Sequence, residues 1–169
     1  MQKKKPECLV SVVMGSDSDL SIMEEATKAL GEFGVSHELY LTSAHRTPER
    51  TTAFTKAAAK RGVKIIIVGA GAAAHLAGVI AAQTLLPVIA VPINATSLQG
   101  LDALLAMVQM PGGIPVGTMA IGKAGAKNAA LLAIRILALE DEALQKKLAA
   151  YVKKMADDVE RKHENLKLK

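Results

Sequence analysis

Aromatic side chains and cysteine are scarce in this chain. Its 169 residues include two Phe, two Tyr, no Trp and a single cysteine, Cys8. A lone cysteine excludes an internal disulfide, which fits a reducing compartment. Half of the residues are apolar, so the core has to be built from Ala, Val, Ile and Leu. Small aliphatic cores of this kind suit helices that lie closely on parallel strands.

Several functional signatures are also missing. The four histidines, His37, His45, His75 and His163, lack the spacing of metal ligands. The chain has neither the Gly-x-Ser-x-Gly turn of acyl-transfer enzymes nor the Gly-x-x-x-x-Gly-Lys-Ser/Thr loop that holds ATP phosphates. We therefore expect no metal site, and the sequence gives no support to ATP use or to acyl-enzyme chemistry.

Long uninterrupted hydrophobic runs are absent as well. The longest apolar stretch, residues 77–93, is broken by polar side chains and two prolines, so we expect no membrane span. Residues 9–14 are too few for the apolar region of a signal peptide, and we expect a cytoplasmic protein. The net charge is +5. Its basic residues gather near both ends without interleaved aromatics, which favours solvated termini over nucleic-acid binding.

The remaining pattern predicts one α/β domain over residues 1–169, with flexible ends at 1–8 and from about 163 to 169. Short β-branched runs alternate with segments of helical spacing, which indicates a parallel sheet with right-handed crossovers. We predict a three-layer α/β/α sandwich, flavodoxin-like, with a five-stranded parallel sheet and a C-terminal helix. The apolar excess also predicts a homo-oligomer. The predicted strands are 9–14, 36–42, 63–68, 87–91 and 116–121, and the predicted helices are 20–33, 48–60, 75–85, 101–109, 128–139 and 140–162.

Four loops that follow predicted strands carry polar or glycine-rich sequences. In a parallel sheet such loops meet at one edge, where open α/β sheets bind ligands. They are Gly15–Asp19, Ser43–Arg46, Gly69–His75 and Pro92–Gly100.

The second loop places an imidazole beside a fixed cation on a strand-to-helix turn. His45 is the candidate proton carrier, because imidazole exchanges protons near neutral pH. Arg46 is the candidate phosphate ligand, because its guanidinium grips two oxygens. The alternative for Arg46 is a structural salt bridge with Glu49 or Asp19.

The residues that follow predict where the next helix starts. Thr47 is expected to cap this helix through its side chain. Pro48 occupies the first turn, where a missing N–H costs nothing.

The first loop has two open interpretations. Backbone N–H groups at the helix start, with the hydroxyls of Ser16 and Ser18, suit an anion. The two aspartates would repel a phosphate, so at least one of them is expected to accept from sugar hydroxyls. The alternative is a plain helix cap, because Ser and Asp favour that position.

The glycine-rich loop has three open interpretations. Residues 69–74 match Gly-x-Gly-x-x-Ala between a strand and a helix, which points to a nicotinamide or flavin dinucleotide. The acid expected about twenty residues later is missing, since Asn94 stands there, and the motif follows the third strand instead of the first. Close approach of a small ligand, faced by His75, fits the glycines better. A purely structural turn is the remaining alternative.

Four motifs, taken together in this order and spacing, resemble those of one family, the catalytic subunit of phosphoribosylaminoimidazole carboxylase. The bacterial form of this family is the 5-(carboxyamino)imidazole ribonucleotide mutase of purine synthesis. The likeness covers residues 9 to about 139. At two positions where the family commonly has Gly and Pro, this chain has Ala72 and Ala77. The motifs are Gly15-Ser16-Asp17-Ser18-Asp19, Ser43-Ala44-His45-Arg46-Thr47-Pro48, Gly69-Ala70-Gly71 with Ala73-Ala74-His75-Leu76, and Gln109-Met110-Pro111-Gly112-Gly113-Ile114-Pro115-Val116.

The resemblance implies transfer of a carboxyl group from the exocyclic nitrogen of an aminoimidazole ribonucleotide to ring carbon C4, without metal, nucleotide cofactor or biotin. It implies a general acid/base role for His45 and ribose-phosphate binding by Ser16, Asp19 and Arg46. It also implies octamers, in which the loop 110–115 closes a neighbouring site, and a pathway partner, an ATP-dependent carboxyaminoimidazole ribonucleotide synthase. The other substrate-binding residues that we predict are Ser18, Ser43, Ala44, Gly71, His75 and Leu76.

Three alternatives to the mutase stay open. The first is a carboxylase that uses CO2 directly, although the animal-type branch lacks the His75 pattern found here. The second is a non-catalytic nucleotide-binding module of the same fold. The third is a dinucleotide-dependent redox enzyme.

Overall fold

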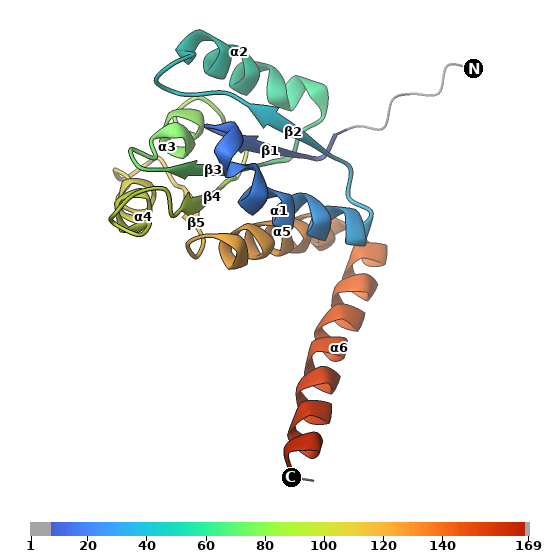
Figure 1. The fold of residues 1–169 in the computed structure, drawn as a ribbon. Coiled ribbons are helices and arrows are strands. Elements are labelled where there is room, and N and C mark those ends of the chain that lie inside the picture. The colour runs from blue at the N-terminus through green and yellow to red at the C-terminus, as the bar shows by residue number, and fades with distance from the viewer. Residues whose placement is uncertain (1–7, 168–169) are drawn as a thin grey trace, which may run out of the picture. The chain divides into compact units, whose positions relative to one another are not determined.

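A five-stranded, all-parallel sheet forms the centre of the computed structural model, which describes residues 8–167 (Figure 1). The strand order is β2-β1-β3-β4-β5. This is the order of flavodoxin-like sheets, so the predicted fold class is confirmed. The strands are β1 Val10–Met14, β2 His37–Leu41, β3 Ile65–Gly71, β4 Val88–Ile93 and β5 Gly117–Thr118.

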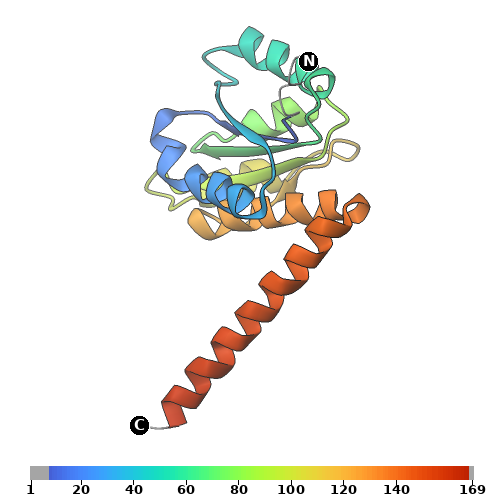
Figure 2. The ribbon, with the colours of Figure 1, turned by 90° about the vertical axis from the view of Figure 1, so that its right-hand side faces the viewer.

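Helices cover both faces of the sheet (Figures 1 and 2). On one face, Phe54, Ile80 and Met107 from three successive helices pack into one buried cluster with Ile66 and Val68 of β3. The other face is covered by α1 and by the part of α5 up to residue 133. The helices are α1 Leu20–Phe33, α2 Pro48–Ala58, α3 Leu76–Ala81, α4 Leu101–Val108, α5 Lys123–Leu137 and α6 Glu142–Lys167, with 3-10 turns η1 Asp17–Asp19, η2 Ala59–Arg61 and η3 Ala138–Glu140.

Two predicted helix ends are confirmed by glycines in the left-handed region. Gly34 ends α1 with φ 73°, and Gly62 follows the 3-10 turn after α2 with φ 93°. A residue with a Cβ would be strained there, so these glycines stop the helices and return the chain to β2 and β3.

The fifth strand is shorter than predicted. It spans Gly117–Thr118 instead of 116–121, and only these two residues pair with β4. Beyond it the chain keeps only separate contacts with β4: Met119 N donates to Ala90 O (2.8 Å) and Gly122 N donates to Pro92 O (2.9 Å).

The start of α5 corrects a predicted loop. We expected a loop over residues 122–127 and a helix from residue 128, but α5 begins at Lys123. Gly122 has a positive φ of 79° and precedes the helix. Gly125 lies inside it, where an added Cβ would overlap the backbone of Ala120. Gly125 therefore serves close packing and does not break the helix.

Two other helix ends also differ from the predicted ones. α3 stops at Ala81 instead of near residue 85, and Thr84 Oγ1 then accepts from Leu86 N (3.1 Å) in the turn before β4. α6 continues to Lys167, so residues 163–167, which we expected to be flexible, are helical. The predictions for residues 1–7 and 168–169 lie outside the described part.

Contacts divide the chain into two compact units, one ending at Ala133 and one beginning at Ile134. Each is described by itself, and the single domain stays a prediction. Within residues 8–167, no helix is both long and apolar enough to cross a membrane.

Candidate active site

The loops after β1 to β4 line one cavity of ≈ 360 Å³ at the carboxyl edge of the sheet. This volume lies within the range of about 300–1,000 Å³ typical of small-molecule sites. The cavity is lined by Gly15, Ser16, Ser18, Asp19, Ser43, Ala44, His45, Arg46, Ala70, Gly71, Ala72, Ala73, Leu76 and Ala95.

The loop after β1 is both a helix cap and a wall of the cavity. Ser16 Oγ accepts from Ser18 N (3.4 Å), while Asp19 Oδ2 accepts from Ser16 N (3.1 Å), which is a reciprocal capping box. Ser18 Oγ donates to Ser16 Oγ (2.9 Å). The capping interpretation is therefore confirmed, and the same side chains still line the cavity.

Asp19 is the buried acid of the site, since only 4% of the residue is exposed. Burial raises the pKa of its carboxyl, while the hydrogen bond from Ser16 N opposes the rise. A carboxyl held in this way is a fixed acceptor for hydroxyl groups of a ligand.

The loop after β2 is held by threonines, in a way that corrects one prediction. Thr47 stands at the N-cap position of α2 but makes no side-chain cap. Its Oγ1 instead accepts from Ser43 N (3.0 Å) and lies 3.2 Å from Thr42 Oγ1, which is 2.9 Å from Thr51 Oγ1. These bonds fix the turn that presents His45 and Arg46.

Arg46 connects the first two loops. Its Nη2 donates to Gly15 O (3.1 Å), and its backbone N donates to Ser43 Oγ (3.2 Å). Among residues 8–167, none of the ion pairs includes Arg46. The proposed salt bridge with Glu49 or Asp19 is therefore wrong, and the guanidinium keeps its charge available to a ligand.

His45 contacts a second imidazole. Its Nε2 lies 2.9 Å from His75 Nδ1, and the rings meet edge to face at 85°. A hydrogen bond between two ring nitrogens needs one donor and one acceptor, so one of the facing atoms carries a proton and the other is bare. The pair can therefore hold one exchangeable proton at a defined place beside the cavity.

Six residues that line the cavity have no side chain longer than a methyl group. We call them the small-residue wall: Ala44, Ala70, Gly71, Ala72, Ala73 and Ala95. Gly71 is required in this wall, because an added Cβ would press on Ala95 Cβ and on Ile93 O. Gly69 lies outside it and makes room for Met23 of α1 instead of for a ligand.

The structure brings together nearly all the residues predicted for the site. His75 does not line the cavity and reaches it only through His45. Sequence reasoning missed Ala95, although its loop was expected at this edge. Among residues 8–167, no group of three His, Cys, Asp or Glu side chains could hold a metal ion.

Comparison with known proteins points to one family. Residues 9–158 match the model of AIR carboxylase. The N5-carboxyaminoimidazole ribonucleotide mutase of Pyrococcus horikoshii is 54% identical over 98% of this chain and 92% of that protein. The protein of the same name from Escherichia coli K12 is 48% identical, with 94% of each chain covered.

A solved structure agrees with the sequence relatives. Treponema denticola PurE superimposes with a TM-score of 0.81 and 30% identity, covering 90% of this chain and 94% of that one. Because the family model matches most of its length and the mutases align along nearly the whole of both sequences, the chain belongs to the AIR carboxylase family.

Proposed function

We propose that this protein is an N5-carboxyaminoimidazole ribonucleotide mutase of de novo purine synthesis. It would convert 5-(carboxyamino)imidazole ribonucleotide into 4-carboxy-5-aminoimidazole ribonucleotide, an isomerisation that needs no cofactor. The observation that carries the proposal is the His45–His75 pair, 2.9 Å apart, beside a cavity that also contains Asp19 and Arg46. The printed names of the mutase relatives support the choice of substrate.

The substrate would lie across the sheet edge. Arg46 and Ser16 would bind the phosphate, because a guanidinium and a hydroxyl both donate to its oxygens. Asp19 would accept from a ribose hydroxyl. This orientation places the imidazole ring against the small-residue wall and beside His45.

In the first half of the reaction, the carbamate C–N bond breaks and releases CO2. The electron pair stays on the exocyclic nitrogen, which takes a proton from His45. The small-residue wall would hold the CO2 close to the ring, where its effective concentration is high.

In the second half, ring carbon C4 attacks the retained CO2 and forms the new C–C bond. His45 then removes the C4 proton and the ring regains its aromaticity. The proton given in the first half is recovered in the second, so the cycle balances. His75 would orient the imidazole through the 2.9 Å contact.

The remaining family-derived predictions belong to the same proposal. We propose a cytoplasmic homo-octamer in which the loop 110–115 closes a neighbouring site. The loop does not line the cavity of its own chain, which is consistent with this role. An ATP-dependent carboxyaminoimidazole ribonucleotide synthase would supply the unstable substrate.

The test is His45→Asn in two separate assays, one with the carbamate substrate and one with the unsubstituted ribonucleotide plus bicarbonate. We expect the variant to lose about 10²–10⁴-fold in rate, the usual contribution of a general acid/base. His163→Asn, an exposed histidine on α6, is the matched control and should retain full activity. An unchanged rate in the His45 variant would refute the mechanism. A preference of the unaltered protein for bicarbonate would favour the direct carboxylase.

A further inference from the structure

A second cavity of ≈ 420 Å³ adjoins the first at the start of α2. Gly15, Ser16, Ser43 and Arg46 line both cavities, so the two cavities adjoin at these residues. The second cavity is completed by Asp17, Leu41, Thr42, Thr47 and Arg50.

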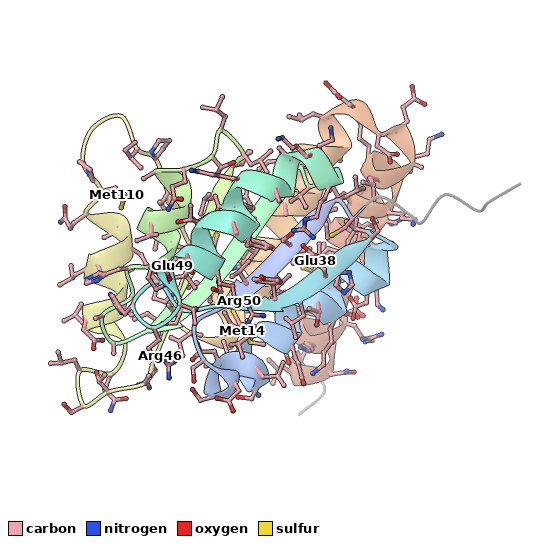
Figure 3. All side chains as sticks on the ribbon, turned by 90° about the horizontal axis from the view of Figure 1, so that it is seen from above. Met14, Glu38, Arg46, Glu49, Arg50 and Met110 are labelled. Carbon is pink, nitrogen blue, oxygen red and sulfur yellow. The ribbon has the colours of Figure 1, made fainter. Side chains whose placement is uncertain are left out.

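Two guanidinium groups face this second cavity. Arg46 comes from the loop before α2 and Arg50 from its first turn, and both line this cavity; Figure 3 labels them. Within the described residues, neither arginine forms an ion pair. The carboxylate that lines the cavity, Asp17, accepts from Ser16 Oγ (3.2 Å) and Ser18 N (3.1 Å). Two cations against one carboxylate leave the cavity positive.

Arg50 is oriented before any ligand binds. Its Nε donates to Tyr40 OH (3.2 Å), and its guanidinium carbon lies 5.2 Å from the centre of the Tyr40 ring. In residues 8–167 its two terminal nitrogens donate to no protein group, so they remain available as a fork for two oxygens.

The surrounding groups suit a phosphate. Ser43 Oγ accepts from Arg46 N (3.2 Å) and keeps its own proton for an oxyanion. Thr42 and Thr47 are fixed by their mutual contact (3.2 Å), so this side of the cavity is rigid. Pre-oriented donors lower the entropy that binding has to overcome.

We propose that the second cavity is a phosphate-binding subsite in which Arg50 joins Arg46 in holding the phosphate monoester of the ribonucleotide. The identity of the ligand rests on the proposed function, whereas the subsite itself rests on the two arginines. Arg46 is shared by both cavities, so a phosphate held between the arginines leaves the sugar and the ring directed towards Asp19 and His45.

Calorimetric titration with ribose 5-phosphate tests the subsite without relying on turnover. We expect Arg50→Gln to weaken binding about tenfold, because one charge-assisted fork is lost. Lys56→Gln, which removes an exposed charge from the same helix outside both cavities, should bind within about twofold of the unaltered protein. Unchanged affinity in Arg50→Gln, or no binding by the unaltered protein, would overturn the proposal.

Kinetics give a second readout. With the mutase substrate, Arg50→Gln should raise KM about tenfold and leave kcat within about twofold, because phosphate binding is equal in ground and transition states.

If Arg50→Gln unfolds, Arg50→Lys replaces it. We expect Arg50→Lys to bind ribose 5-phosphate about threefold more weakly, because lysine lacks the two terminal nitrogens of the guanidinium group. An unchanged affinity in Arg50→Lys would overturn the proposal. Failure of the His45 assay would refute the mutase and leave the titration result intact.

Discussion

Ala72 shows how strain is stored in a single residue of the site. It has φ 54°, in the left-handed region, although it carries a Cβ and lies in the small-residue wall. L-residues in this region are strained by roughly 1–2 kcal/mol. Glycine, which the family commonly has at this position, would relieve the strain, with part of the gain offset by the entropy of the unfolded chain.

We predict that Ala72→Gly raises the free energy of unfolding by about 0.5–1 kcal/mol. Urea unfolding measures this change. Ala73→Gly is the control, since Ala73 is also exposed and lines the same wall without a positive φ. It should be neutral or destabilising. Stabilisation by both substitutions would show that the strain at Ala72 is not the cause.

The raised pKa of Asp19 predicts a pH dependence of stability. A folded-state pKa above the ordinary value of 3.8 means that the folded protein holds this proton more tightly than the unfolded chain. Stability from this group is therefore fully present below pH 3.8 and is lost as the pH rises through the raised value. In Asp19→Asn this dependence disappears, while the amide oxygen can still accept from Ser16 N.

Urea unfolding of the unaltered protein and Asp19→Asn between pH 3.5 and pH 7 checks the sign. The free energy of unfolding of the unaltered protein, relative to that of the variant, should fall as the pH rises. All other carboxylates are common to both proteins and cancel in the difference. A relative free energy that rises with pH would mean that the burial of Asp19 does not dominate its pKa.

Within the site, the sequence predicted those functional residues whose chemistry requires a particular type of side chain. His45, Arg46 and the serines of the first loop follow strands, so their meeting at one edge follows from the parallel sheet. The contact between His45 and His75 was not predictable, because it depends on side-chain directions from two loops. Ala95 and Arg50 carried no distinguishing motif.

At the scale of elements, the turn between β2 and α2 depends on Thr47. Thr47→Val keeps the shape but leaves Ser43 N without its acceptor. We predict a loss of about 1–3 kcal/mol in the free energy of unfolding. The rate should fall as well, because the same turn carries His45 and Arg46.

Thr52→Val provides the matched control for this prediction. Thr52 is half-buried on the same helix, and its side chain makes no hydrogen bond within residues 8–167. It should change stability by less than about 0.5 kcal/mol. Equal effects of the two substitutions in thermal unfolding would mean that the Thr47 network does not hold the turn.

Element types were predictable, whereas several boundaries were not. β1, β3 and β4 are buried runs whose apolar residues alone indicate strands. β5 and α5 were harder, because only two residues of β5 pair with β4 and Gly125 serves packing inside a helix. Such boundaries depend on contacts distant in sequence, which periodicity does not contain.

At the scale of the whole molecule, α4 predicts self-association. Leu101, Leu105 and Val108 lie at helical spacing on one face and are each about half exposed. A second copy of the chain, as in the proposed octamer, would cover them. Leu105→Glu should lower the mass seen by sedimentation, because burying an unpaired carboxylate is costly.

The control places the same charge elsewhere. Ala53→Glu introduces a glutamate at an exposed position of α2, and we expect it to keep the assembly intact. A monomer in the unaltered protein, or an unchanged mass in Leu105→Glu, would contradict the role of α4.

The small-residue wall has a consequence for how this protein can change. Alanine and glycine have no side-chain rotamers, so the small-residue wall cannot adapt to a different ligand by a change of rotamer. Its shape is that of the main chain itself, and the close contact of Gly71 with Ala95 couples the loops after β3 and β4. Apart from alanine to glycine, every substitution in the small-residue wall adds atoms to the cavity lining. Accommodating a bulkier molecule would therefore require rebuilding the backbone of two loops at once.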